Sequence, residues 1–389
     1  MRAKNQQKGL NPEMFLVRTL LDTKSLLLSP TRNGYGEGLV EAGKGNEKIV
    51  VLCCDLTEST RSEVFKKAFP DRFIQMGIAE QALASIGAGM AMAGKVPFIS
   101  SYAAFSPGRN WEQIKTTIAL QNSNVKIAGA HAGLSVGPDG ATHQMLEDIS
   151  ITRVMPNMAV EVPCDAIETK KTVLVGAKTP GPLYFRFARA ASPVFTTQKT
   201  PFKPGRTEVF RFGNDLTLIA AGPLLYEALL AADVLSKEHG IECRVLNAHS
   251  IKPFDEKTLI AAAKETGAIV TIEEGQVSGG LAGVVCETLA LTTPVPVERV
   301  GAQDTYGESG EPAQVLEAFG LTAPFIALAA ARVFDRKHGV AVSKIPAHIQ
   351  AAKERRDLMR ERIFAEALSR APRKWGGTKP DFKPKTRSK

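Results

Sequence analysis

The chain has 389 residues, of which 44% are apolar and 23% are charged, so it can fill two domain cores and is not globally disordered. Its formal net charge is +9, but residues 351–389 hold 13 of the 49 Lys and Arg and only 5 of the 40 Asp and Glu. The remaining body is nearly neutral and has no run of 18 apolar residues, which argues against a nucleic-acid-binding body and against a membrane-spanning helix.

The first 30 residues have weak periodicity and no strong helix caps, so we expect residues 1–30 to form an arm that lies on another surface. The apolar stretch within this arm is interrupted by Arg18, Asp22 and Lys24, unlike a signal peptide. The five cysteines are scattered and form no CxxC pair, which favours reduced thiols and a cytoplasmic location.

From residue 31 to about 195, strand-like and helix-like segments alternate. Continuous apolar strands that alternate with helices indicate a parallel sheet with helices on both faces. The expected strands are 49–54, 97–101, 125–130 and 183–187, and the expected helices are 79–93 and 165–177.

A Pro- and Thr-rich stretch, 192–205, indicates a linker, and a second alternation follows over 205–330. The sequence therefore predicts an α/β protein of two consecutive doubly wound domains. Residues 340–389 form a basic tail, which we expect to be helical over 346–371 and disordered over 372–389. The strands expected in the second domain are 216–220, 242–246, 268–272 and 295–300.

In open parallel sheets, ligands bind beyond the carboxyl ends of the strands, which directs attention to the segments that follow the predicted strands. The most specific of them is 131–144, where His131, Asp139 and His143 lie among glycines that let the backbone approach a ligand. Histidines exchange protons near neutral pH and can act at a hydroxyl or carbonyl group. The alternative interpretation is a Gly-rich surface loop with incidental histidines.

Glu80 lies near a predicted helix start among apolar neighbours, where a carboxylate can exchange a proton with a base. Alternatively, it only stabilises the amino end of the helix through the helix dipole. Tyr102 and Phe105 follow the next predicted strand, and they either stack on a ligand or fill the core.

Arg32, Ser59 and Arg189 are candidates for phosphate binding, since the guanidinium fork suits phosphate. Taken singly, each Arg is more commonly a solvated surface residue. No His or Cys cluster has metal-ligand spacing, so we predict no metal ligand in this chain.

Together these segments resemble the carboxyl-terminal half of transketolase. That family has an Asp-Leu-Thr turn, a Gly-x-x-Glu helix start and a loop that ends in Asp-Gly-x-(Thr/Ser)-His-Gln, and all three occur here in that order. The second unit is similar to the transketolase carboxyl-terminal domain at residues 247–255, 272–276 and 278–280. The resemblance covers about residues 31–330 and implies a thiamine-diphosphate pyrimidine-binding domain over 31–195 and a transketolase carboxyl-terminal domain over 205–330.

The resemblance implies a role for each matching residue. Glu80 would contact the aminopyrimidine of thiamine diphosphate at N1′, where protonation favours the imino tautomer that removes the thiazolium C2 proton. For the cofactor, the resemblance also implies that Phe105, with Tyr102 nearby, stacks on the pyrimidine and that Asp55 contributes to binding. For the sugar, it implies that His143 and Asp139 contact the ketose hydroxyls and that His131 lies deeper in the sugar channel. It implies phosphate binding by Arg32, Ser59 and Arg189.

The amino-terminal half of the family, which binds Mg²⁺ and the cofactor diphosphate through a Gly-Asp-Gly motif, has no match here. The resemblance therefore implies the second subunit of a split transketolase that transfers ketol units between sugar phosphates. An amino-terminal-half partner subunit would bind Mg²⁺ and the diphosphate, and the active site would lie between chains in an α₂β₂ assembly.

Two features depart from the family. Residues 188–191 lack the Gly or Ser that often precedes the Arg and the Pro that often follows it, so Arg186 could share the phosphate role with Arg189. The basic extension has no transketolase counterpart. Our interpretation is that 346–371 packs on a partner, and the alternatives are that the extension binds a polyanion or has no specific role.

Three other functions remain open at this point. Two are enzymes of the same architecture, the β subunit of a 2-oxo acid dehydrogenase and the catalytic half of deoxyxylulose-phosphate synthase. The sugar-transfer type of motif at 139–144 argues against the first, and the Ala-His-Ala-Gly segment at 130–133 argues against the second. The third is a structural or regulatory subunit whose basic tail binds RNA.

Overall fold

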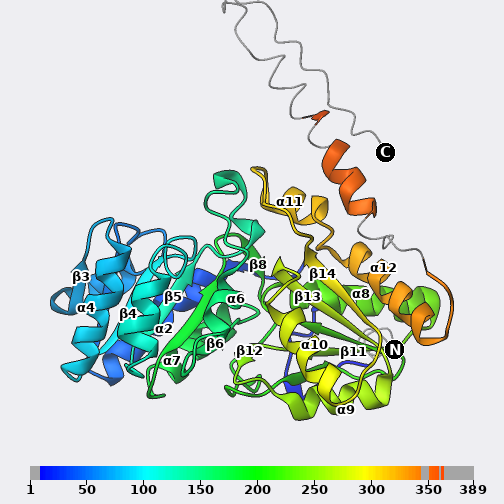
Figure 1. The fold of residues 1–389 in the computed structure, drawn as a ribbon, viewed down its shortest axis with the longest axis horizontal. Coiled ribbons are helices and arrows are strands. Elements are labelled where there is room, and N and C mark those ends of the chain that lie inside the picture. Colours follow the sequence, from blue (N-terminus) through cyan, green and yellow to red (C-terminus); the bar gives the residue numbers. More distant parts are fainter. Residues whose placement is uncertain (1–8, 343–349, 359–360, 363–389) are drawn as a thin grey trace, which may run out of the picture.

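The computed structural model describes residues 9–342, 350–358 and 361–362, and it confirms two consecutive α/β domains that lie side by side (Figure 1). The first domain is built on a seven-stranded sheet of order β12-β6-β7-β5-β4-β2-β3, in which all strands are parallel except β12. The strands predicted from the sequence are present, and β3, β6 and β12 are additions. The strands are β2 (Ile49–Cys53), β3 (Phe73–Gln75), β4 (Val96–Tyr102), β5 (Lys126–Ala130), β6 (Ala159–Glu161), β7 (Leu183–Phe187) and β12 (Ser250–Lys252).

The first sheet is buried on both faces, as its continuous apolar strands predict. Ile49 and Val51 of β2 face one hydrophobic cluster, and Val50 and Leu52 face another, because successive side chains point to opposite sides of a strand. Helices α2 (Thr31–Gly45) and α7 (Ala166–Gly176) cover the first face, and α4 (Glu80–Met92) covers the second.

The second domain has a five-stranded sheet of order β14-β13-β10-β11-β9, with only β9 antiparallel. Helices α8 and α12 cover one face, while α9 and α10 cover the other. The elements are β9 (Glu208–Arg211), β10 (Leu216–Ala220), α8 (Leu224–His239), β11 (Cys243–Asn247), α9 (Glu256–Thr266), β13 (Ile269–Gln276), α10 (Leu281–Leu291), β14 (Val297–Ala302), α11 (Pro312–Ala318) and α12 (Ala323–Lys337).

The two domains share structure. Strand β12 comes from the second domain in sequence but pairs with β6 of the first sheet, and Ser250 donates a 2.8 Å hydrogen bond to Glu161. The predicted linker is tied down by Asp165, which accepts the backbone N–H groups of Phe195 and Thr196. One hydrophobic cluster is continuous from α4 to α9 and α10. These contacts fix the position of each domain against the other.

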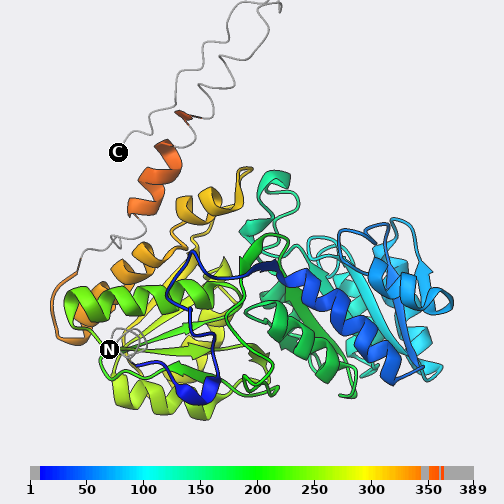
Figure 2. The same cartoon turned by 180° about the vertical axis from the view of Figure 1, so that it is seen from behind.

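The described part of the amino-terminal arm runs across the second domain before it reaches α2 (Figure 2). Asn11 donates to the Val209 carbonyl at 2.7 Å, and the hydroxyl of Tyr226 donates to the Leu20 carbonyl at 3.1 Å. Strand β1 (Leu28–Pro30) then pairs with β8 (Ala191–Pro193). The surface on which the predicted arm lies is therefore the carboxyl-terminal domain of the same chain.

Residues 350–358 are helical, in agreement with the predicted helix, and they contact this chain's own second domain. Arg355 pairs with Glu317 at 2.8 Å, and Ala352 is buried. The predicted disorder over 372–389 lies outside the described residues.

Within the described residues, one stretch, Pro312–Lys337, is long and apolar enough to cross a membrane by length and composition. It consists of two helices, α11 and α12, that meet at a turn. Ile326, Ala330 and Val333 of α12 are fully buried in the hydrophobic cluster that covers one face of the second sheet. This stretch therefore packs as core helices of the second domain.

Helix α2 offers a test of its packing through two of its glycines. A Cβ at Gly34 would lie 1.9 Å from the Ala166 carbonyl oxygen, whereas a Cβ at Gly45 would meet nothing within 4 Å. We expect Gly34→Ala to lower the free energy of unfolding by about 2 kcal/mol or more, because backbone must move. Gly45→Ala should change it by no more than about 1 kcal/mol. Urea unfolding of both variants measures this, and equal effects would contradict the described α2–α7 contact.

Candidate active site

The polar residues that the sequence singles out lie at the carboxyl ends of adjacent strands of the first sheet. Asp55 follows β2, Tyr102 ends β4, His131 follows β5 and Arg189 follows β7. The strands are parallel, so these side chains share one edge of the sheet. Glu80 joins them because α4 begins at that residue.

The carboxylate of Glu80 is buried, with 1% exposure, and each of its oxygens has a partner. One oxygen accepts the hydroxyl of buried Ser101 at 3.0 Å, and the other accepts Arg109 at 3.3 Å. Asn110 donates to the Glu80 carbonyl at 2.8 Å, which fixes the start of the helix. Because the Arg109 side chain is half exposed, that partner lies at the open side of the site. Both partners are polar residues in ordinary sequence surroundings, and no sequence signal marks them.

Four rings form a cluster beside Glu80. The rings of Tyr102 and His131 stack with centroids 4.0 Å apart, and Tyr102 and Phe105 stack at 6.0 Å. His143 meets the edges of both aromatic rings, at 6.2 Å from Tyr102 and 5.5 Å from Phe105. These residues lie up to 41 positions apart in the sequence, and the fold brings them into one group. This agrees with the prediction that segments following the parallel strands meet at one edge of the sheet.

His131 is the most constrained member of this ring cluster. Its backbone has a positive φ of 56°, which is unusual for a residue other than glycine. Both ring nitrogens are buried without a hydrogen-bond partner in the described part of the chain. Burial, together with the nearby cations Arg32 and Arg189, lowers the pKa of His131 to about 3. The imidazole is therefore neutral at physiological pH and presents an unused donor and an unused acceptor.

Cationic side chains gather on the other side of His131. Arg32 donates to the Ser59 carbonyl at 2.9 Å, and Arg189 pairs with Asp139 at 3.1 Å. Burial lowers the pKa of Arg32, and the neighbouring charges of Arg61 and Arg189 lower it as well. Arg61 pairs with Glu63 at 3.4 Å and Arg189 with Asp139, whereas Arg32 is bound to a backbone carbonyl, so the group contains more cations than carboxylates and suits an anion. Of the three, Arg61 was not predicted from the sequence, because it lies in no recognisable motif.

Arg186 is engaged in a buried ionic group, so it is less available for phosphate than Arg189, and the choice between the two remains a prediction. Its side chain is buried, pairs with Asp148 at 3.3 Å and donates to the Glu274 carbonyl at 3.0 Å. The Tyr184 hydroxyl completes this buried group by donating to Asp148 at 2.6 Å. Arg189 lies two residues further on, is 38% exposed and faces the site.

Asp55 is placed at the correct strand end but on the surface. Its φ is 55°, and its backbone N–H donates to Gln75 at 2.9 Å. Among the described residues, no group of three or more His, Cys, Asp or Glu side chains is arranged to hold a metal ion. The cofactor role of Asp55 remains a prediction.

The carboxyl-terminal domain holds the loop that carries His131, Asp139 and His143. Glu274 of β13 accepts the backbone N–H of Ser135 at 2.5 Å, and Gln144 donates to the Glu308 carbonyl at 2.9 Å. A Cβ at Gly307 would lie 1.8 Å from the Gln144 side-chain oxygen, so the second domain closes tightly over this loop. The sequence marked Gln144 as part of a motif but gave no indication of its partner.

Comparison with known proteins agrees with this architecture. Residues 29–194 match the family model described as the transketolase pyrimidine binding domain, and residues 205–326 match the transketolase C-terminal domain. The fold and site thus define a thiamine-diphosphate type of domain pair.

The chain belongs to the transketolase family, as its relatives show. It is 40% identical over 299 residues to a putative transketolase C-terminal section from Methanocaldococcus jannaschii, which covers 76% of this chain and 93% of that protein. It is 39% identical to one of the subunits of apulose-4-phosphate transketolase from Phocaeicola vulgatus, over 75% of this chain and 93% of that relative. Human transketolase is 37% identical over 77% of this chain, and this chain spans 48% of its length.

Solved structures support the same assignment. A structure described as a split-gene transketolase, an inactive β4 tetramer, superposes with a TM-score of 0.74 and 44% identity, over 79% of this chain and 99% of that chain. Transketolase from Campylobacter jejuni has the same fold, with a TM-score of 0.66, 22% identity and coverage of 85% of this chain and 52% of that chain. In extent, the chain corresponds to the carboxyl-terminal section of a split transketolase.

The pKa of His131 predicts how stability depends on pH. The unfolded histidine binds a proton below about pH 6.5, while the folded one stays neutral to about pH 3, so the native state loses stability as the pH falls through this window. Between about pH 7 and pH 5, wild type should lose about 2 kcal/mol more than His131→Gln. Urea unfolding at the two pH values tests this difference, and parallel losses in both proteins would contradict the neutral state of His131.

Proposed function

We propose that this chain is one subunit of a thiamine-diphosphate-dependent transketolase that transfers a two-carbon ketol unit from a ketose phosphate to an aldose phosphate, as in the pentose phosphate pathway. The observation that carries the proposal is one sheet edge that joins a buried carboxylate, two histidines and a cationic group. Proton-transfer groups and a phosphate receptor are what ketol transfer between sugar phosphates requires of the protein besides the cofactor.

The residues beside Glu80 fit the pyrimidine end of thiamine diphosphate. Ser101 holds one Glu80 oxygen from the buried side, so the second oxygen faces the open side of the site. A pyrimidine nitrogen would replace the half-exposed Arg109 as partner of that oxygen, and the faces of Phe105 and Tyr102 would bound the ring. When bound, the cofactor supplies carbanion stabilisation, and this chain orients and polarises it.

The histidines and Asp139 would handle the sugar. Neutral His131 offers its two unpaired ring nitrogens to substrate hydroxyls, which would relieve the cost of burying them unpaired. The Nδ1 atom of His143 and the Thr142 hydroxyl share a hydrogen bond of 2.9 Å, whose direction depends on the histidine tautomer. The Nε2 atom of His143 is therefore available for the substrate. We propose that His143 moves the proton at the donor hydroxyl and that Asp139 contacts an adjacent hydroxyl.

A partner subunit would complete the site by binding Mg²⁺ and the cofactor diphosphate. The exposed surface along α4 supports this: Ile78, two residues before Glu80, is 76% exposed, and Met92 at the far end of α4 is 74% exposed. Beside α4 packs η3 (Ile114–Ala119), and Leu120 and Val154 are exposed at an apolar cavity of about 450 Å³ next to it. Exposed apolar surface of this kind is typical of protein interfaces. We propose that the partner covers it in an α₂β₂ assembly in the cytoplasm.

The ketol-transfer assay tests the reaction. This chain is combined with the amino-terminal-half subunit, thiamine diphosphate, Mg²⁺, xylulose 5-phosphate and ribose 5-phosphate, and sedoheptulose 7-phosphate is measured. We expect product from the pair only, and Glu80→Gln should lower kcat by about 10²-fold or more because the carboxylate is lost. Glu112→Gln, at an exposed carboxylate nearby, is the control and should leave kcat unchanged.

A different pattern of turnover in this assay would overturn the proposal. Consumption of pyruvate in place of xylulose 5-phosphate would favour deoxyxylulose-phosphate synthase or 2-oxo acid dehydrogenase chemistry. An inactive pair that still assembles and binds the cofactor would favour a structural subunit.

The phosphate role of Arg189 predicts a selective defect. Arg189→Ala should raise KM for xylulose 5-phosphate by at least about tenfold, because a charge-assisted hydrogen bond is lost. The same variant should change KM for unphosphorylated xylulose by less than about threefold. Steady-state kinetics with both donors measures this split, and equal changes would show that Arg189 acts through Asp139 and the loop instead.

A further inference from the structure

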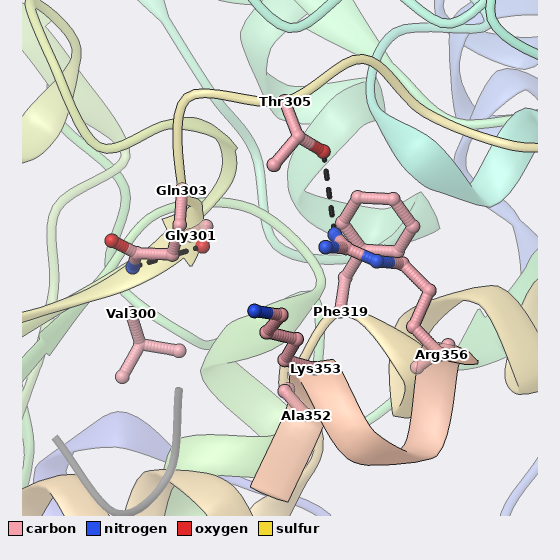
Figure 3. Close-up of a pocket in the computed structure, with 10 residues that line it drawn as sticks. Val300, Gly301, Gln303, Thr305, Phe319, Ala352, Lys353 and Arg356 are labelled. Carbon is pink, nitrogen blue, oxygen red and sulfur yellow. Dashed lines mark hydrogen bonds between the residues drawn. The ribbon is translucent and has the colours of Figure 1, made fainter. Parts of the chain in front are cut away.

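A cavity of about 150 Å³ lies between helix 350–358 and the second domain, where β14 ends and α11 turns into α12 (Figure 3). It is separate from the ring cluster of the candidate active site. The helix contributes Lys353 and Arg356 to its wall, and the domain contributes Gly301, Gln303, Thr305 and Phe319. Lys353 points into the cavity in Figure 3. The residues that form it belong in part to the extension that has no transketolase counterpart.

The two cations face the cavity together because they are three residues apart on one helix. Arg356 is fixed from two sides: its guanidinium lies 5.3 Å from the Phe319 ring centroid, and it donates to the Thr305 hydroxyl at 3.4 Å. Its Nε is buried without a hydrogen bond in the described part of the chain and lies 3.8 Å from the Glu308 carboxylate. Within the described ranges, no hydrogen bond or ring contact restrains Lys353, and its side chain is exposed.

The charge in this cavity is not balanced by its own wall. Among the described residues that line it, none is a carboxylate. Of the acidic residues nearby, Glu317 pairs with Arg355 on another side of the helix, at 2.8 Å, whereas Glu308 pairs with Arg356 at 3.8 Å from outside the wall. The wall itself therefore presents a pre-positioned guanidinium that Glu308 partly neutralises, together with the ammonium group of Lys353 and no carboxylate. Two cations side by side in a cavity wall without a carboxylate are a suitable arrangement for binding an anion.

We propose that this cavity binds a small phosphate-bearing anion. A cavity of about this volume holds a benzene-sized molecule, so a phosphate group fits with at most a short carbon chain, whereas a nucleotide does not. The guanidinium of Arg356 would bind phosphate oxygens from its fixed position, and Lys353 would close on them as a mobile point charge.

The site is connected to the loop that carries His131 and His143. Thr305 borders the cavity, and its carbonyl accepts the side chain of Gln276 at 2.9 Å. Three residues further on, the Glu308 carbonyl accepts Gln144. An anion in the cavity would thus lie against residues 305–308, the same segment that contacts the active-site loop at Gln144.

Calorimetric titration of the full chain with inorganic phosphate tests the proposal, in the Arg189→Ala background so that the other cationic group does not compete. We expect saturable binding at millimolar phosphate that weakens by about tenfold in Lys353→Met, which removes the charge and keeps the aliphatic stem. Arg355→Gln removes one charge from the same helix away from the cavity and is the matched control. It should change affinity by less than about twofold. Glycerol 3-phosphate in a second titration shows whether a short organic group is accepted.

Two results would overturn the assignment. Absence of saturable phosphate binding would exclude the site. Equal weakening in Lys353→Met and Arg355→Gln would show that phosphate responds only to the net charge of the helix. Arg356 is unchanged in both variants, so its contacts to Phe319 and Thr305 keep the helix docked.

Discussion

A buried ionic group beneath the carboxyl edge of the first sheet is the interaction on which the candidate site depends. Arg186 of β7 contacts both Asp148 and the backbone of Glu274, so it joins the first domain to β13 of the second. Burial raises the pKa of Glu274 and Arg186 opposes that shift, while the Glu274 carboxylate holds the N–H of Ser135 in the active-site loop. Removal of one partner from such a group leaves an uncompensated buried charge, which costs about 3–5 kcal/mol. Through this contact to Ser135, the buried ionic group holds the loop 131–144 in place, and the loop in turn positions the rings of His131 and His143.

The two domains have different roles in this arrangement. The first domain supplies Glu80, the ring cluster and the cationic group from the segments that follow its strands and from the starts of α2 and α4. The second domain supplies no group to the reacting centre that we propose; it fixes the loop through Glu274 and through the carbonyl of Glu308. The exposed apolar residue Ile78 lies beside Glu80, and Met92 extends the exposed apolar surface to the far end of α4, where we propose that another subunit binds.

The sequence predicted the fold class and located the strand-end residues because both depend on local patterns. Apolar runs mark the strands, and the motif spacing places His131, Asp139 and His143 in one loop. Pairings between distant segments could not be predicted, since they depend on how the chain closes in three dimensions. Examples are β12, which joins the sheet of the other domain, Arg109 beside Glu80, and helix 350–358, which contacts Glu317 of its own chain. The choice between Arg186 and Arg189 was open for the same reason, because only burial against Asp148 and Glu274 distinguishes them.

The central claim is that this chain holds the pyrimidine half of a cofactor site which another subunit completes. Calorimetric titration with thiamine diphosphate in the presence of Mg²⁺ tests it most directly, with this chain alone, the amino-terminal-half subunit alone and the two combined. The account predicts tight, Mg²⁺-dependent binding only in the combination. Tight Mg²⁺-dependent binding by this chain alone would contradict the claim, because the site would then be complete within one chain.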